Sequence, residues 1–319
     1  MSKKPLTRDE QFLAKAAGDD VLMPKPLTRV QEFLERIVER LNGSVTDETL
    51  SNAIAPLNAS IAQLSRETIQ FRHGKGTFTA TANGTNITWQ YGGQKVQGSS
   101  CTFDVKSDNG LITLECDAIE SFVIQNDTTN KIDLSDLGGK ITNTLSLYNS
   151  PNITGDLSDL GGKITNTLRL GGCPNITGDL SDLGGKITNT LSLYNCTNIT
   201  GDLSDLGGKI TSVLSLDNSP NITGDLSDLG GKISSALNLD NCPNITGVYS
   251  GTKYPKTFTV SKTAITSADM DANLINFAAS GVKSGAFTAN GMKRTAASDD
   301  AVATLVTNGW TVSGLTKES

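Results

Sequence analysis

The sequence predicts an α/β solenoid, a stack of short repeats whose strands pair side by side in a parallel sheet. First, the segment GDLSDLGGKI occurs unchanged at 155–164, 178–187, 201–210 and 224–233, so its period is a constant 23. Second, aliphatic residues recur with the same period; in one copy they are Leu157, Leu160, Ile164, Leu168, Leu170 and Ile176. A single copy buries too little apolar surface to fold alone, so the copies must stack.

Each repeat carries a short strand and a small polar position. The pair Leu168-x-Leu170 is expected to be the strand, and Gly161-Gly162 the turn on the opposite side. Three residues after the second leucine, every copy has a cysteine or serine, which we expect to point inward and bond the turn backbone of the neighbouring repeat. These residues are Ser150, Cys173, Cys196, Ser219 and Cys242.

This pattern, from Leu168 through Cys173 to Ile176, resembles the leucine-rich repeat in its variant with cysteine at the Asn/Cys position. The solenoid is therefore interpreted as leucine-rich-type. It departs from that family because Ile164 stands four residues, not three, before Leu168. Asn175 also stands where the commonest form has leucine.

The solenoid is expected to cover residues 122–250, and residues 251–319 to be degenerate repeats with a C-terminal cap. Two helices are expected there, at roughly 267–281 and 298–309, because capping residues and glycines enclose apolar residues at helical spacing. The strand-like segments of this region are Phe258–Val260, Phe287–Ala289 and Trp310–Val312.

Residues 1–44 contain a second, shorter repeat, because KPLTR occurs at 4–8 and again at 25–29. In each copy a threonine followed three residues later by Glu or Gln predicts the start of a short helix. Two such helices bury too little to fold alone, so their apolar residues favour docking onto another protein. The alternative is a small helical hairpin that packs on itself.

Residues 45–73 are expected to form a coiled-coil oligomerisation helix, and residues 74–121 a small β module. The heptad positions, which Pro56 interrupts, give a short and marginal seam; an ordinary amphipathic helix is the alternative. Alternating runs and Asn-Gly or Gly-Gly turns predict the β module. The heptad residues are Leu50, Ile54, Leu57, Ile61 and Leu64.

Composition argues against several classes of function. The net charge of −6 disfavours a nucleic-acid partner, and no apolar stretch is long enough to span a membrane. The N-terminal residues lack the apolar core of a secretory signal peptide. Five cysteines without CxxC spacing and a single histidine, His73, indicate neither a disulfide framework nor a metal site. With no nucleophile–base set and no phosphate loop, we expect no enzyme and no cofactor.

The repeats differ from one another at positions on and after the strand that alternate with the buried leucines and so face outward. Polar and aromatic side chains there suit recognition of a ligand such as a glycan; neutral variation at solvated positions is the alternative. The Asn-x-Thr triplets need no sugar, because turn chemistry explains them, and the Asp156 and Asp159 positions lack calcium-loop spacing. The candidate ligand-binding residues are Tyr148, Arg169, Tyr194, Asp217 and Asp240.

The paired N-terminal units resemble a motif of head-fibre proteins of tailed phages, where tandem copies precede a coiled coil and fix the fibre to the capsid. The solenoid resembles repeat adhesins of gut Bacteroidetes and their phages, so the whole chain resembles a head fibre of a crAss-like phage of such hosts. The capsid-binding residues implied are Pro5, Leu6, Thr7, Arg8, Phe12, Leu13, Pro26, Leu27, Thr28, Arg29, Phe33 and Leu34.

This resemblance implies a structural virion protein on the capsid surface. Its partners would be the major capsid protein or a capsid-decorating protein, and a host surface polysaccharide at the solenoid. Viral fibres are commonly trimers, which implies a parallel homotrimer, although the heptads alone favour a dimer. The alternative is a bacterial leucine-rich-repeat surface adhesin or protein-interaction module.

Overall fold

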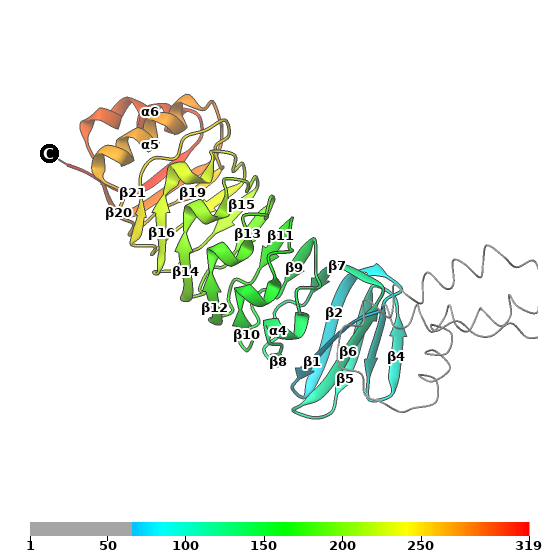
Figure 1. Ribbon diagram of the computed structural model, residues 1–319. Coiled ribbons are helices and arrows are strands. Elements are labelled where there is room, and N and C mark those ends of the chain that lie inside the picture. The colour runs from blue at the N-terminus through cyan, green and yellow to red at the C-terminus, as the bar shows by residue number, and fades with distance from the viewer. Residues whose placement is uncertain (1–65, 319) are drawn as a thin grey trace, which may run out of the picture. The chain divides into compact units, whose positions relative to one another are not determined.

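Strands dominate the part of the chain that the computed structural model describes, residues 66–318 (Figure 1). Within this range the strands form one sheet of eleven and two sheets of five. The pairing through the repeats is parallel, as a solenoid-like stack requires. Helices are few: α4 is Leu134–Leu137, α5 is Ser267–Ala279 and α6 is Asp299–Thr307.

The first eight strands form a β-sandwich with an aromatic core. Buried and exposed residues alternate along its strands, and Phe71 of one sheet packs on Phe78 of the other with ring centroids 5.6 Å apart. One sheet has the order β4-β3-β6-β1-β8 and comprises β1 (Glu67–His73), β3 (Thr88–Tyr91), β4 (Gln94–Gln97), β6 (Gly110–Cys116) and β8 (Asn130–Lys131). The second contains β2 (Gly76–Thr85), β5 (Ser100–Val105) and β7 (Ala118–Val123).

The sandwich corrects two expected boundaries. Glu67–His73, the end of the segment 45–73 expected to be a coiled-coil helix, is strand β1. Its period-2 alternation of buried Ile69, Phe71 and His73 is a strand pattern, which the heptad spacing of the preceding residues obscures. The β module extends beyond 74–121, because β1 and β8 both belong to it.

The second sheet of the sandwich continues directly into the repeats. Strand β7 pairs in parallel with β9, with Phe122 opposite Leu145, so β7 belongs to the sandwich and also precedes the repeat strands in the same sheet. Each later strand then pairs with its equivalent one period on, as Leu168 does with Leu145 and Leu191. These strands are β9 (Thr144–Ser146), β11 (Thr167–Arg169), β13 (Thr190–Ser192), β15 (Val213–Ser215) and β17 (Ala236–Asn238).

Each repeat also contributes a strand to a second parallel sheet, which was not predicted from the sequence. Its order is β10-β12-β14-β16-β18. The alternation of exposed Asn and Thr around a buried Ile in Asn-Ile-Thr is a strand pattern, so the expected turn at these triplets is wrong. The strands are β10 (Thr154–Asp156), β12 (Asn175–Asp179), β14 (Asn198–Asp202), β16 (Ile222–Asp225) and β18 (Asn244–Thr246).

The segment Leu-Ser-Asp-Leu that follows forms only one 3₁₀ turn, so the repeats are mostly β rather than α/β. An aspartate caps its start and a left-handed glycine ends it, as Asp179 and Gly184 do (Gly184 φ 60°), which leaves room for four residues. The turn at the glycine pair is as predicted. The 3₁₀ turns are η1 (Leu157–Leu160), η2 (Leu180–Leu183), η3 (Leu203–Leu206) and η4 (Leu226–Leu229).

The end of the chain extends the eleven-stranded sheet and covers it with both expected helices. Strands β19 (Thr257–Thr259), β20 (Ala286–Arg294) and β21 (Thr311–Lys317) pair in parallel. Phe277 of α5 packs against Phe258 and Phe287 of β19 and β20, with ring centroids 4.7 and 5.3 Å away. The two predicted helices are therefore confirmed. Phe258 and Phe287 lie in strands β19 and β20, whereas Trp310 directly precedes β21.

The small polar position of the repeats is used as predicted. The buried thiols of Cys173, Cys196 and Cys242 donate to backbone carbonyls of the preceding repeat, over 3.1, 3.2 and 3.1 Å. The hydroxyl of Ser219 makes the equivalent bond to Leu193 over 3.4 Å. The hydroxyl of Ser150, in the first full repeat, is buried without a partner among the described residues.

Candidate functional site

The outer row of the strands, where ligand binding is expected, is largely occupied by its own side chains. Tyr194 lies over Gly171: a Cβ at that glycine would stand 2.2 Å from the tyrosine ring. Its ring also packs on Tyr148, two repeats away, with centroids 5.6 Å apart. Burial raises the pKa of the Tyr194 phenol, which keeps it a hydrogen-bond donor. The two tyrosines thus cover the outer position at Gly171, where this repeat has no side chain.

The two aspartates of this row bind backbone of the following turn. The carboxylate of Asp217 accepts from the Asp240 amide over 3.2 Å and from the Ser215 hydroxyl over 2.7 Å. Asp240 in turn accepts from the Ser261 amide over 2.8 Å. Burial raises the pKa of Asp217 despite these bonds. Both residues therefore have a structural role that the sequence alone did not reveal.

Of the five candidate ligand-binding residues, only Arg169 is exposed, and the other four are half-buried. The neighbouring outward positions that hold serine are buried, at 2% for Ser146 and 7% for Ser192 and Ser215, because adjacent side chains cover them. Ser146, for example, accepts a bond from the Gln125 amide. The residues of this row alternate with fully buried leucines such as Leu168 and Leu170, and their polar groups mostly bond one another or nearby backbone.

A ladder of hydrogen-bonded asparagine side chains runs alongside this row. Its first member is Asn126, which has no earlier asparagine to bond. Asparagines in the left-handed conformation follow the strands, and each amide nitrogen donates to the asparagine one turn earlier, as Asn218 does to Asn195 and Asn241 to Asn218. Gly172 interrupts the ladder, and there the Tyr194 hydroxyl reaches across to Asn149. Asn149 donates to Asn126, the first asparagine, over 3.1 Å.

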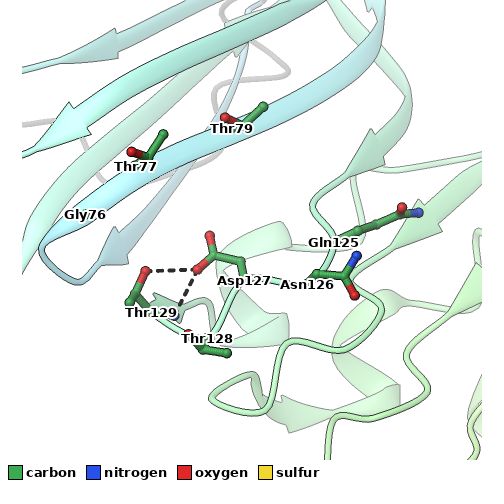
Figure 2. A pocket seen from close by; sticks show the side chains of 8 residues that line it. All are labelled: Gly76, Thr77, Thr79, Gln125, Asn126, Asp127, Thr128 and Thr129. Carbon is green, nitrogen blue, oxygen red and sulfur yellow. Dashed lines mark hydrogen bonds between the residues drawn. The ribbon is translucent and has the colours of Figure 1, made fainter.

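The ladder starts beside a pocket of about 270 Å³. Figure 2 shows Thr77 and Thr79 on strand β2 at one side and the segment 125–129 at the other. The lining groups are hydroxyls, amides and one carboxylate, that of Asp127. The residues lining it are Gly76, Thr77, Thr79, Gln125, Asn126, Asp127, Thr128 and Thr129.

The single histidine holds the carboxylate of this pocket. His73 is fully buried, and its Nε2 lies 2.9 Å from Asp127 Oδ2 while its Nδ1 lies 2.6 Å from the Gly74 carbonyl. The backbone and hydroxyl of Thr129 donate to the other Asp127 oxygen. Burial opposes the charged carboxylate, but the bonds from His73 and Thr129 outweigh it, so the pKa of Asp127 is lowered. The sequence favours an ordinary surface position for the lone histidine, which is wrong because His73 is buried, and it assigns no role to Asp127.

The repeated aspartates are explained by capping. The side chain of Asp179 accepts from the Ser181 amide at the start of the 3₁₀ turn and from the Thr200 hydroxyl of the next repeat, over 3.0 and 2.8 Å. Asp182 bonds back to the Asp179 amide over 2.9 Å. Within residues 66–318 no group of His, Cys, Asp and Glu is arranged to hold a metal ion.

The remaining predicted site residues lie outside the described range. These are the implied capsid-binding residues, between Pro5 and Leu34, and the heptad residues, between Leu50 and Leu64. Among the described helices, none is long and apolar enough to cross a membrane.

Comparison with known proteins returned no matching family model, no matching curated protein and no matching solved structure.

Proposed function

We propose that this protein is a structural head fibre of a tailed phage, attached to the capsid by its N-terminal segment and displaying a leucine-rich-type solenoid outward. The observation that carries the proposal is the tandem KPLTR unit, followed by apolar heptads and then by a repeat domain. This order of parts is that of an anchored fibre.

The described residues support a display role in two ways. The β-sandwich and the repeats share the eleven-stranded sheet, so they are joined by backbone pairing rather than by a linker. In addition, the repeated cysteine, threonine and asparagine side chains bond one turn to the next. A stack of this kind suits a spacer that carries a binding site away from a surface.

Purified virions would test the location directly. Mass spectrometry and labelling with an antibody to the solenoid should find the chain on the capsid of intact particles. Its absence from virions, with exposure on bacterial cells instead, would favour the surface adhesin.

The anchor itself is tested by deletion of residues 1–44. The truncated chain should fold, because its sandwich and solenoid are unaffected, but should no longer be recovered with capsids. The matched control is Val306→Ser, which alters an exposed apolar residue on helix α6 and should leave incorporation unchanged. Normal incorporation of the truncated chain contradicts the anchor.

A further inference from the structure

The turn that precedes the first full repeat carries more polar residues than the equivalent turns of the later repeats. Counting back one period from Ser150 and Ile153 gives Asp127 and Asn130. A position that later bonds backbone thus carries a carboxylate here, and a position buried as isoleucine in the repeats carries an amide. Asn130 is fully buried, and its amide nitrogen has no partner among the described residues. Local departures of this kind are typical of functional sites.

We propose that the pocket between strand β2 and residues 125–129 binds a neutral saccharide. The proposal concerns this pocket and not the outer row of the repeats, and it holds whether or not the chain is a capsid fibre. Its basis is the chemistry of the lining, the open end of the asparagine ladder and the fixed carboxylate of Asp127.

The lining offers what sugar hydroxyls require. A hydroxyl both donates and accepts, so it pairs well with a carboxylate on one side and an amide N–H on the other. Asp127 supplies the acceptor, held in place by His73 and Thr129. Asn126 supplies the donor: its oxygen is used by Asn149, and no asparagine precedes it to accept from its nitrogen. Thr77 and Thr79 add exposed hydroxyls from the opposite side (Figure 2).

The same lining argues against other ligand classes. None of the eight lining residues is lysine or arginine, so a phosphate or carboxylate would meet only the charge of Asp127. None is aromatic or aliphatic, which disfavours a lipid or a flat apolar molecule. The volume of about 270 Å³ lies just below the range of roughly 300–1,000 Å³ typical of small-molecule sites, so it suits one sugar ring at a chain end or branch.

The test uses the full chain and a panel of single sugars: the methyl glycosides of glucose, galactose and mannose, and N-acetylglucosamine. Saturation-transfer NMR and calorimetry should show saturable binding of at least one at millimolar concentration. Glucuronate and inorganic phosphate serve as charged probes. Failure of every neutral sugar to bind, or binding of the charged probes alone, overturns the proposal.

Two pairs of variants localise the binding. Asn126→Gly keeps the left-handed backbone (φ 57°) but removes the donor, and should weaken binding about tenfold. Asn195→Gly removes an equivalent ladder asparagine (φ 58°) away from the pocket and should change nothing. Thr79→Val should weaken binding, whereas Thr81→Val, on the same strand outside the lining, should not. Equal binding by Asn126→Gly and the unaltered chain overturns the assignment to this pocket.

Discussion

The repeats between residues 133 and 246 and the turns after residue 250 extend the same parallel sheet, but different contacts stabilise them. In the repeats, each turn bonds the previous one through the same polar side chains, such as Cys196 to Leu170 and Thr200 to Asp179. After residue 250 these ladders give way to two helices over an aromatic cluster. The cluster consists of Tyr249, Tyr254, Phe258, Phe277, Phe287 and Trp310.

This difference indicates how a stack of thin layers ends. An interior repeat has a neighbour on each side to complete its hydrogen bonds and cover its leucines, so small side chains suffice. Among the described residues, β21 is at the edge of the sheet, and the turns next to it bury their surface with large side chains instead. The stabilising contacts are therefore spread evenly through the repeats and concentrated near Phe277 at the end.

The largest loss of stability should come from a substitution in the aromatic cluster around Phe277. Phe277→Ala removes the ring that packs between Tyr254, Phe287 and Trp310, and it should lower the free energy of unfolding by about 3–5 kcal/mol. Denaturant titration followed by circular dichroism measures the loss. The matched substitution Leu191→Ala in a central repeat should cost about 2–5 kcal/mol, toward the lower end because less volume is removed. A larger loss at Leu191 would contradict the contrast between the regions.

A substitution at Gly201 tests how closely neighbouring repeats approach each other. A Cβ at Gly201 would lie 2.7 Å from the backbone nitrogen of Leu180 in the preceding repeat, and its φ of 115° disfavours any other residue. Gly201→Ala should therefore destabilise the chain by about 2–4 kcal/mol, from backbone strain and overpacking together.

Gly98→Ala is the matched control for that substitution. Gly98 has nearly the same φ, 118°, but nothing lies within 4 Å of its added Cβ. Thermal unfolding of the two variants separates strain from the close approach of repeats. Equal losses would mean that the repeats can move apart to admit a methyl group.

A smaller, pH-dependent effect is expected at the capping aspartates. Bonds from the Ser181 backbone, the Ser181 side chain and Thr200 lower the pKa of Asp179 in the folded chain below that in the unfolded chain. Its charged form therefore stabilises the fold at neutral pH, and this contribution is lost as the pH falls through the folded-state pKa. Asp179→Ala should cost about 1–2 kcal/mol at pH 7 and less in acid. If Asp179→Ala costs the same stability at pH 7 and in strong acid, the charge of Asp179 is not the origin of the loss. Lys186→Ala, on the exposed side of the same turn, is the control.

The same contrast explains what could be predicted from the sequence. The constant period fixes strand register, because each residue pairs with its own copy, and the repeat alignment alone therefore makes Leu168 and Leu191 partners. The inward Cys and Ser were predictable for the same reason. The sandwich was only partly predicted, because its pairs join distant, unrelated segments such as Phe71 and Ile112.

The functional residues were harder to identify than the fold. Variation among the repeats pointed to Tyr194, Asp217 and Asp240, yet a variable side chain can equally serve its neighbours, and these do. The signal for the pocket was present at the other end, in the polar residues that replace Ser and Ile when the period is extended back to Asp127 and Asn130. Residues that break the repeat pattern, such as Asp127 and Asn130, therefore indicate the pocket better than the residues that vary among the regular repeats.

The smallest effect should be seen at the thiol position of a central repeat. Cys196→Ser keeps a donor to the Leu170 carbonyl, and Ser219 shows that a hydroxyl can make this bond. Leu170 also accepts from the Cys173 amide, so its carbonyl is not left unpaired even by Cys196→Ala. We expect a loss of stability below about 1 kcal/mol for serine, and more for alanine, which leaves a small cavity.

Burial raises the pKa of the Cys196 thiol to about 12, so alkylation of the native chain at pH 8 should be slow and should follow unfolding of the repeat. Rapid alkylation under native conditions, or a serine variant as unstable as Phe277→Ala, would show that the central repeats are not the evenly supported layers that their ladders indicate.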